Sequence, residues 1–420
     1  MEKLIRYENG LRVIVDTVPG LKTVAAGIWV HMGSSKEHPE INGLSHFTEH
    51  MMFKGTDKLS AYEIADAFES FGAHINAFTG KECTCYYVKS IDEHAESCFE
   101  LLSHIFCDSV FDEAELDKER NVILEEINMV EDTPEDICYD LLAESLYGGC
   151  PIGQTILGSP KNVKQFKQKD VSAFVNQFYC AENTVISLAG NLTLSDADQY
   201  VRKYVLPKIC GRKSRAAEVS AFSKNRTHTE RIKDFEQSNI AIGFPSLPFN
   251  DKRASVQNVL NIILGGGMSS RLFQAIREKL GLAYSVYSAP SAFIHNGSFN
   301  IVLNISPDNT QKTLNAVAAE LKKVLGGDIT QKELIRAKTQ LKSAMIFARE
   351  NVQSIMNANG KLLTVAGEVY DINRKISEIE AVKISEVNQF AAETFRDETL
   401  STAYVGKAYK ADFNAFSIKN

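Results

Sequence analysis

The feature that most constrains the fold is a weak internal repetition at an offset close to half the length of 420 residues. Three short segments of the first half return in the same order in the second half, each about 210 residues later. The matched pairs are Ser70–Ala73 with Lys279–Leu282, Glu115–Leu116 with Glu333–Leu334, and Leu188–Gly190 with Tyr404–Gly406. We therefore predict two similar domains, at residues 1–207 and 232–420, joined by a polar and basic linker at 208–231.

Strand and helix patterns alternate in blocks within the first half. Leu11–Asp16 and Thr23–Val30 are rich in β-branched residues and flank Pro19-Gly20, which predicts two paired strands joined by a turn. Helical spacing is seen at about 64–71, 92–107 and 113–131, with a strand pattern at 84–88. This alternation favours the α+β class, so we expect each domain to be a mainly antiparallel β-sheet packed with α-helices.

The composition excludes several classes of protein. The 46 basic and 53 acidic residues give a formal charge of −7 without a long basic stripe, so nucleic acid is not expected as a partner. No window approaches the roughly 18 consecutive apolar residues of a membrane helix, and Met1–Tyr7 does not begin a signal or transit peptide. We therefore expect a cytoplasmic protein without membrane association, whose eight cysteines are thiols rather than a disulfide framework.

A metal-binding pattern lies between residues 43 and 53. His46, Glu49 and His50 form a His-x-x-Glu-His motif, preceded by Ser45 as a candidate helix cap. On a helix, His50 lies about 40° around the axis from His46 and Glu49 about 60° to the other side, so all three share a face. Two neutral imidazoles suit zinc, and the carboxylate can take a proton from water on the metal. This order of residues is the inverted zincin signature.

A catalytic zinc ion takes one more protein ligand in addition to two histidines. The predicted helix at 113–131 offers candidates for this third ligand. Glu119 and Glu126 are seven residues apart and share a helix face, whereas Glu125 points elsewhere. The spacing alone does not choose the ligand.

The chain resembles the M16 metallopeptidases, which include pitrilysin, insulin-degrading enzyme and mitochondrial processing peptidase. The likeness is greatest to the short, two-domain members and covers essentially the whole length. Besides the motif at 46–50, it is carried by Gly72–Thr79, Glu119–Glu126, Pro151–Gly158, Gly265–Arg271 and Gly281–Tyr284. The resemblance implies that His46, His50 and Glu126 bind zinc. It also implies that Glu49 is the general base and that Glu119 supports the site from behind.

The resemblance has consequences for assembly as well. Residues 255–267 of the second half read SVQNVLNIILGGG and lack the motif, so we expect one zinc ion per chain. Because members of the family enclose the substrate between two pairs of domains, a two-domain chain is expected to form a homodimer. Arg277 and Tyr284 match the Arg and Tyr that stabilise the oxyanion in the family, and the likeness suggests that they act on the partner's zinc.

The resemblance also indicates how a peptide would bind. One strand resembles the exposed edge on which the family pairs with the substrate backbone. Its residues are Asn76, Ala77, Phe78 and Thr79. Asp136 and Asp140 fall where processing peptidases hold a substrate arginine, which gives the hypothesis of a basic residue near the scissile bond. The other interpretation of this acidic run is a solvated helix start.

These patterns together predict a zinc-dependent endopeptidase that hydrolyses peptides or unfolded protein segments. The alternative is a catalytically silent homologue that acts as a structural or regulatory subunit. Silent relatives commonly lack one or more of the two histidines and two glutamates, and this chain keeps all four.

Overall fold

The computed structural model describes residues 2–211 and 226–419, and the chain divides into two compact units. Unit 1 comprises Met1–Ile127, Gln154–Glu218 and Phe347–Tyr370, and unit 2 comprises Asn128–Gly153, Val219–Ile346 and Asp371–Asn420. Each unit therefore takes segments from both halves of the chain. The domain boundaries 1–207 and 232–420 stay a prediction. Of the linker predicted at 208–231, residues 212–225 lie outside the described part and residues from 227 onward belong to a strand.

Unit 1 is built on a six-stranded sheet. In order across the sheet, the strands are β1 (Glu2–Arg6), β2 (Arg12–Thr17), β6 (Thr184–Gly190), β3 (Thr23–Val30), β5 (Thr84–Ile91) and β4 (His74–Thr79). Neighbouring strands are antiparallel, except that β2 and β6 are parallel. The predicted pairing of residues 11–16 with 23–30 is wrong, because β6 lies between β2 and β3 and pairs with both. All seven residues of β6 are buried, so both of its edges need backbone partners.

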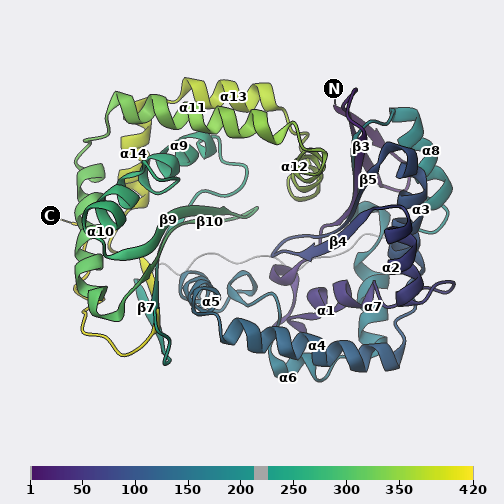
Figure 1. Cartoon of the computed structure of the whole chain (residues 1–420), viewed down its shortest axis with the longest axis horizontal. Helices are drawn as coiled ribbons and strands as arrows, with labels where there is room; N and C mark the ends of the chain where they lie inside the picture. The colour runs from purple at the N-terminus through teal and green to yellow at the C-terminus, as the bar shows by residue number, and fades with distance from the viewer. Residues whose placement is uncertain (1, 212–225, 420) are drawn as a thin grey trace. The chain divides into compact units, whose positions relative to one another are not determined.

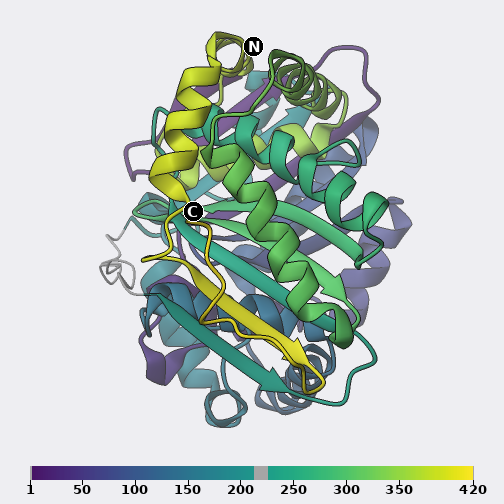
Figure 2. The same ribbon diagram turned by 90° about the vertical axis from the view of Figure 1, so that its left-hand side faces the viewer.

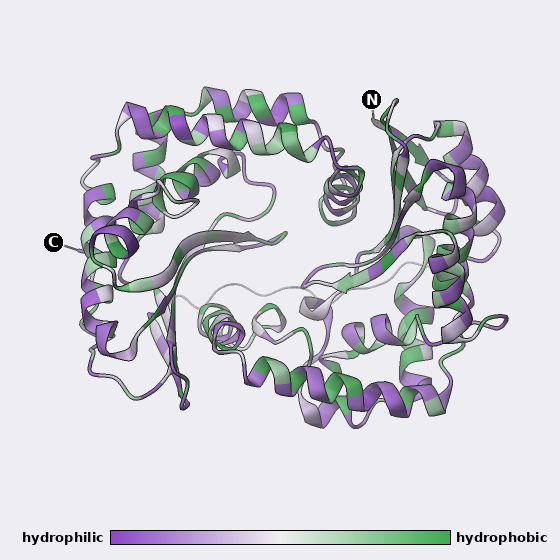
Figure 3. Cartoon of the chain, in the orientation of Figure 1, coloured by the Kyte–Doolittle hydropathy of each residue, from purple (hydrophilic) through white to green (hydrophobic). Residues whose placement is uncertain are grey.

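Most helices of the first half lie on one side of this sheet (Figure 1). They are α1 (Leu44–Met51), α2 (Ala61–Ser70), α3 (Ala95–Asp108), α4 (Glu113–Glu131), α6 (Pro160–Val163), α7 (Gln168–Phe178) and α8 (Leu194–Tyr204). Alternate residues of β3, among them Val24, Ala26 and Ile28, point into the core shared with these helices. Hydrophilic and hydrophobic residues alternate along the helices (Figure 3), as expected for helices with one buried face.

A helix from the second half of the chain, α12 (Val352–Val365), packs on β3 and β6 from the other side (Figure 1). Gly360 of this helix lies directly on the Trp29 ring, where an added Cβ would be 2.2 Å from the indole Nε1. Only glycine therefore allows so close an approach. The Ser187 hydroxyl also donates a hydrogen bond of 2.8 Å to the backbone carbonyl of Met356. The second half thus supplies part of the core of unit 1.

Unit 2 repeats this architecture. Its strands, in order across the sheet, are β7 (Thr227–Ile232), β11 (Ser401–Gly406), β8 (Ser238–Ser246), β10 (Gly297–Ile305) and β9 (Ala283–Ala292). Only β7 and β11 are parallel (Figure 2), as β2 and β6 are in unit 1. Gly190 and Gly406, which the sequence repeat aligns, end the equivalent strands β6 and β11. The prediction of two similar α+β domains related by duplication is confirmed.

Helices cover the sheet of unit 2 in the same manner. They are α9 (Ala254–Leu264), the π-helix η6 (Phe273–Lys279), α10 (Thr310–Leu325), α11 (Gln331–Ala348), α13 (Ile372–Ala381) and α14 (Ile384–Thr394). Here the first half of the chain contributes α5 (Pro134–Tyr147), which packs on β8 and β11. Its buried residues Ile137 and Leu142 contact the core around Ala241. The two repeats therefore exchange one helix each. The helix α5, which follows α4, packs in unit 2, and the helix α12, which follows α11, packs in unit 1.

Two expectations from the composition concern cysteines and membranes. No disulfide bond joins any of the eight cysteines, all of which lie in the part of the chain that the structure describes, as predicted. Among the residues that the structure describes, no helix has the length and apolarity needed to cross a lipid bilayer.

Candidate metal centre

The metal-binding motif lies on α1, a helix of only eight residues with an unusual start. Gly43 precedes it with a φ of 101°, and an added Cβ would be 2.6 Å from the carbonyl oxygen of Leu157. Both the left-handed backbone and this close approach require glycine. The predicted cap Ser45 is already the second residue of the helix, and the N-cap position is held by Gly43. The prediction that Ser45 caps the helix is therefore wrong.

The helix is capped instead by the carboxylate of Glu37, which is fully buried. Its Oε2 accepts from the backbone N–H of Gly43 at 2.8 Å, and its Oε1 accepts from the backbone N–H of Ser45 at 2.5 Å. Burial raises the pKa of Glu37, although these hydrogen bonds act in the opposite direction. A negative group at a helix N-terminus satisfies free N–H groups and interacts favourably with the helix dipole. Glu37 thus fixes the direction in which α1 presents its histidines.

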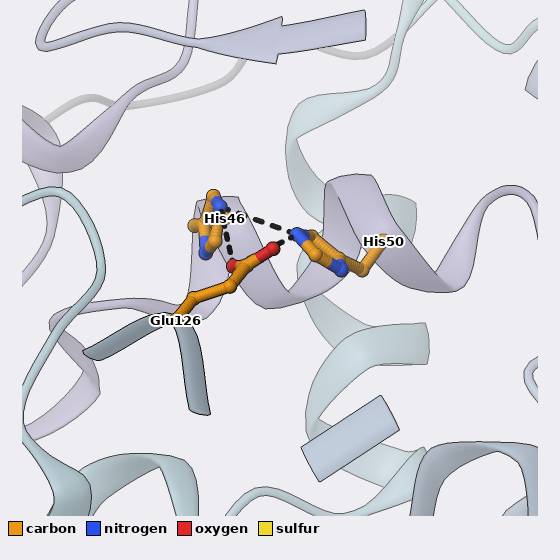
Figure 4. A group of neighbouring side chains, drawn as sticks. All are labelled: His46, His50 and Glu126. Atoms are coloured by element: carbon orange, nitrogen blue, oxygen red, sulfur yellow. Dashed lines mark hydrogen bonds and ion pairs between the residues drawn. The ribbon is translucent and has the colours of Figure 1, made fainter. Parts of the chain in front are cut away.

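Three side chains converge at one point beside α1 (Figure 4). The Nε2 atoms of His46 and His50 are 3.3 Å apart, and Oε2 of Glu126 lies 3.7 Å and 3.5 Å from them, respectively. Donors around a tetrahedral zinc ion with bonds of about 2.0–2.1 Å are roughly 3.3 Å apart. The residues present therefore fit a zinc ion. In residues 2–211 and 226–419 this is the one group of His, Cys, Asp or Glu side chains that could hold a metal.

The structure distinguishes Glu119 from Glu126, the two glutamates between which the sequence left the choice of ligand open. Glu126 of α4 reaches the two histidines, whereas Glu125 is exposed. Glu119 lies two turns earlier on the same helix, is 5% exposed, and accepts from His50 Nδ1 at 2.7 Å through its Oε1. This hydrogen bond places the proton of a neutral His50 on Nδ1 and leaves the lone pair of Nε2 directed toward Glu126.

The two histidines have opposite electrostatic environments. Burial and the neighbouring His50 lower the pKa of His46 to about 3, which keeps its imidazole neutral. Burial alone would lower the pKa of His50 as well, but the hydrogen bond to Glu119 and the nearby carboxylate of Glu126 raise it above its ordinary value. Burial would raise the pKa of Glu119, yet its hydrogen bonds from His50 and Lys54 hold it below the usual range. The negative charge of Glu119 and Glu126 therefore favours a cation beside His50.

Glu49 projects from the same face of α1 and is held from the side by β4. The hydroxyl of Thr79, the last residue of β4, donates a hydrogen bond to Glu49 Oε2. Burial raises the pKa of Glu49, partly offset by this hydrogen bond. A carboxylate with a raised pKa is a better proton acceptor near neutral pH.

The predicted substrate strand is the edge strand β4 of the sheet. It pairs with β5 on one side, so the other row of its backbone N–H and C=O groups faces away from the sheet. Asn76 and Phe78 are exposed, while Ala77 and Thr79 are half-buried on the opposite face. Of these four residues, Thr79 is the one whose side chain donates a hydrogen bond to Glu49.

The remaining candidate residues belong to unit 2, where they form two separate groups. Arg277 lies on η6 and Tyr284 on β9, with the guanidinium carbon 5.7 Å from the centre of the tyrosine ring. Tyr284 is 73% exposed. Asp136 is exposed and Asp140 half-buried, four residues apart on α5. The structure therefore brings Arg277 and Tyr284 together and places Asp136 and Asp140 one helical turn apart on the same helix.

Sequence reasoning missed two residues near the candidate metal centre, Glu37 and Lys54. Glu37 lies eight residues before the helix position that it caps, outside the usual capping spacing. Lys54 lies four residues after His50, and its Nζ is 2.5 Å from Glu119 Oε2. A lysine and a glutamate 65 positions apart give no local signal, so only the packing of α4 against the end of α1 reveals the pair.

The chain is similar to known proteins over most of its length. The family described as insulinase (peptidase family M16) matches residues 12–160, and the peptidase M16 inactive domain matches residues 165–341. The Bacillus subtilis uncharacterized zinc protease YmxG is 38% identical, over 95% of this chain and 97% of its own length. Uncharacterized zinc proteases of Streptomyces coelicolor and Rickettsia felis are 35% and 34% identical, over 91% and 94% of this chain and 85% and 95% of their own lengths, respectively.

Solved structures with the same fold are more distant in sequence. A protease from Helicobacter pylori superposes with a TM-score of 0.92 at 22% identity, covering 97% of this chain and 99% of that one. A peptidase M16 inactive domain from Pseudomonas fluorescens gives a TM-score of 0.89 at 20% identity, with 98% and 99% covered. These two likenesses concern the fold alone.

Proposed function

The chain belongs to peptidase family M16, and from this premise we propose that it is a zinc-dependent endopeptidase acting on peptides or unfolded protein segments. The observation that carries the proposal is the convergence of His46, His50 and Glu126 at distances suited to one zinc ion, with Glu49 beside them. Its relatives in several bacteria are named zinc proteases. When bound, zinc polarises a peptide carbonyl and lowers the pKa of water.

In the proposed hydrolysis, Glu49, Thr79 and strand β4 have different roles. Glu49 accepts a proton from the attacking water and returns it to the leaving amine, as a general base and then a general acid. Thr79 fixes the orientation of Glu49 through Oε2, and the free edge of β4 pairs with the substrate backbone. Backbone pairing gives affinity with little dependence on sequence, which suits an enzyme that acts on unfolded segments.

The rival function is a catalytically silent subunit. The two functions differ in what the purified, zinc-loaded chain does to an unfolded peptide. The endopeptidase is expected to cleave it within the chain and to lose this activity when the zinc is chelated. A zinc-loaded chain that leaves such peptides intact would favour the silent subunit.

We also propose that the active form is a homodimer in which Arg277 and Tyr284 of one protomer stabilise the oxyanion at the zinc of the other. The support is that both residues are exposed beside each other in unit 2. Two variants test this arrangement, because Glu49→Gln removes the base while Arg277→Ala removes the oxyanion contact. Random mixing of the two chains is expected to restore about a quarter of wild-type hydrolysis, since half of the dimers then hold one complete site.

The measurement is peptide hydrolysis by each variant alone and by the mixture after exchange of protomers, with native mass spectrometry to show that mixed dimers form. Mixed dimers without recovered activity would contradict action across the interface. A chain that stays monomeric while fully active would exclude the dimer.

The acidic residues Asp136 and Asp140 on α5 carry a specificity proposal. Since Asp136 is exposed and the two carboxylates lie one helical turn apart, they suit a guanidinium from a bound peptide. The double change Asp136→Asn with Asp140→Asn is expected to lower the preference for an arginine-containing peptide over a neutral one about tenfold. The ratio of kcat/KM for the two peptides measures the preference, and an unchanged ratio would leave the acidic run as a solvated helix start.

A further inference from the structure

Lys54 lies in the turn that follows α1 and reaches back toward the metal centre. Its backbone N–H donates to the carbonyl of Met51, the last residue of α1, at 3.2 Å. Its Nζ lies 2.5 Å from Oε2 of Glu119. The other carboxylate oxygen of Glu119 is 2.7 Å from Nδ1 of His50. Lys54, Glu119 and His50 therefore form a continuous chain of contacts that ends at a candidate zinc ligand.

The ion pair between Lys54 and Glu119 matters for the site because the Glu119 carboxylate is buried. The side chain of Glu119 is 6% exposed, whereas that of Lys54 is 28% exposed. A carboxylate withdrawn from water needs a paired cation, and removing the cation of a buried pair is costly because it leaves a charge without compensation. Removing Lys54 takes away the cation at Glu119 Oε2 and leaves the hydrogen bond from His50 at Oε1. Lys54 thus holds the carboxylate in the position where it can accept from His50.

The two candidate histidine ligands differ in this respect. His46 Nδ1 is buried and has no hydrogen-bond partner among the described residues. His50 alone of the two is therefore oriented by a carboxylate, and that carboxylate is in turn fixed by Lys54. Groups that orient a metal ligand from behind commonly change metal affinity 10–100-fold when they are removed.

We propose that Lys54 is a positioning residue of the zinc site, which anchors Glu119 so that Glu119 holds the His50 ring in the orientation needed to bind the metal. This inference rests on the proposed function, because it assigns a role toward the zinc ion of that function. The contacts that carry it are the 2.5 Å pair of Lys54 with Glu119 and the 2.7 Å hydrogen bond of Glu119 with His50.

The first test measures zinc affinity by competition with a chromogenic chelator. Lys54→Met is expected to weaken zinc binding about 10–100-fold, and Lys54→Arg to retain most of the affinity. Lys118→Met is the matched control, since the Lys118 side chain is 70% exposed and its ammonium pairs with Glu115 on α4, whereas the lysine paired with the Glu119 carboxylate is Lys54. Zinc affinity of Lys54→Met within twofold of the wild type would overturn the inference.

A double-mutant cycle shows whether Lys54 acts through Glu119. In a Glu119→Gln background the buried charge is absent, so adding Lys54→Met is expected to change zinc affinity less than twofold. Lys54→Met alone leaves a buried carboxylate without a paired cation and can therefore fold poorly. The double variant has no such charge, so its zinc affinity can still be compared with that of Glu119→Gln. Independent, additive losses would overturn the proposed route. Failure of the wild-type chain to bind zinc would instead overturn the proposed function, which separates the two claims.

Discussion

Glu49→Gln is expected to lower kcat for peptide hydrolysis about 10²–10⁴-fold while the chain keeps its zinc. Glutamine has nearly the same shape as glutamate, and its amide oxygen can still accept the hydrogen bond from the Thr79 hydroxyl. The amide cannot take up a proton, so proton transfer from the attacking water is lost. The metal ligands His46, His50 and Glu126 are untouched, so zinc content is expected to stay that of the wild type.

This prediction is checked by steady-state kinetics on an unfolded peptide, together with zinc analysis of the same samples. Glu125→Gln is the matched control, because Glu125 is an exposed glutamate outside the metal group. Its kcat is expected to equal that of the wild type. Undiminished hydrolysis by Glu49→Gln would show that another group accepts the proton.

The ligand face of α1 and the helix α4 were predictable because both depend on short-range spacing. Four residues along a helix bring His46 and His50 together whatever surrounds them. The choice of Glu126 over Glu119 and Glu125 was not predictable from spacing, since it depends on how α4 crosses α1. The structure places Glu126 at the histidine Nε2 atoms and Glu119 at the opposite nitrogen of His50.

The duplication was predictable for a different reason. Apart from the additional strand β1 of unit 1, the two sheets share their strand order, and the short segments that repeat in sequence lie at equivalent ends of strands and helices. The insertion of β6 between β2 and β3 was not predictable from local patterns, because strands so far apart in sequence pair through tertiary packing.

The exchange of α5 and α12 between the two units was likewise not predictable from the sequence. Both helices carry apolar residues that must be buried, but an amphipathic pattern does not say which sheet receives them. Gly360 on α12 lies against the Trp29 ring, but the need for glycine at this position can be understood only once the contact with Trp29 is known. Tertiary contacts of this kind also explain why the cap by Glu37 was missed.

His50→Ala is expected to produce the largest loss of zinc binding. The change removes one of three protein donors and also leaves Glu119 without its hydrogen bond from the imidazole. Since outer partners of a metal ligand are already worth 10–100-fold in affinity, the loss of the ligand itself is expected to exceed about 100-fold. Peptide hydrolysis is expected to fall with the zinc content. His295→Ala, at an exposed histidine in unit 2, is the control and is expected to retain both.

The most direct measurement is the zinc content of the purified wild-type chain and of His50→Ala, determined by mass spectrometry after equal exposure to zinc and removal of the excess. We predict one zinc ion per wild-type chain, almost none in His50→Ala, and hydrolysis that disappears with a chelator and returns with zinc. Equal zinc in the two proteins, or a wild-type chain that cleaves peptides with no metal bound, would contradict the proposed metal centre.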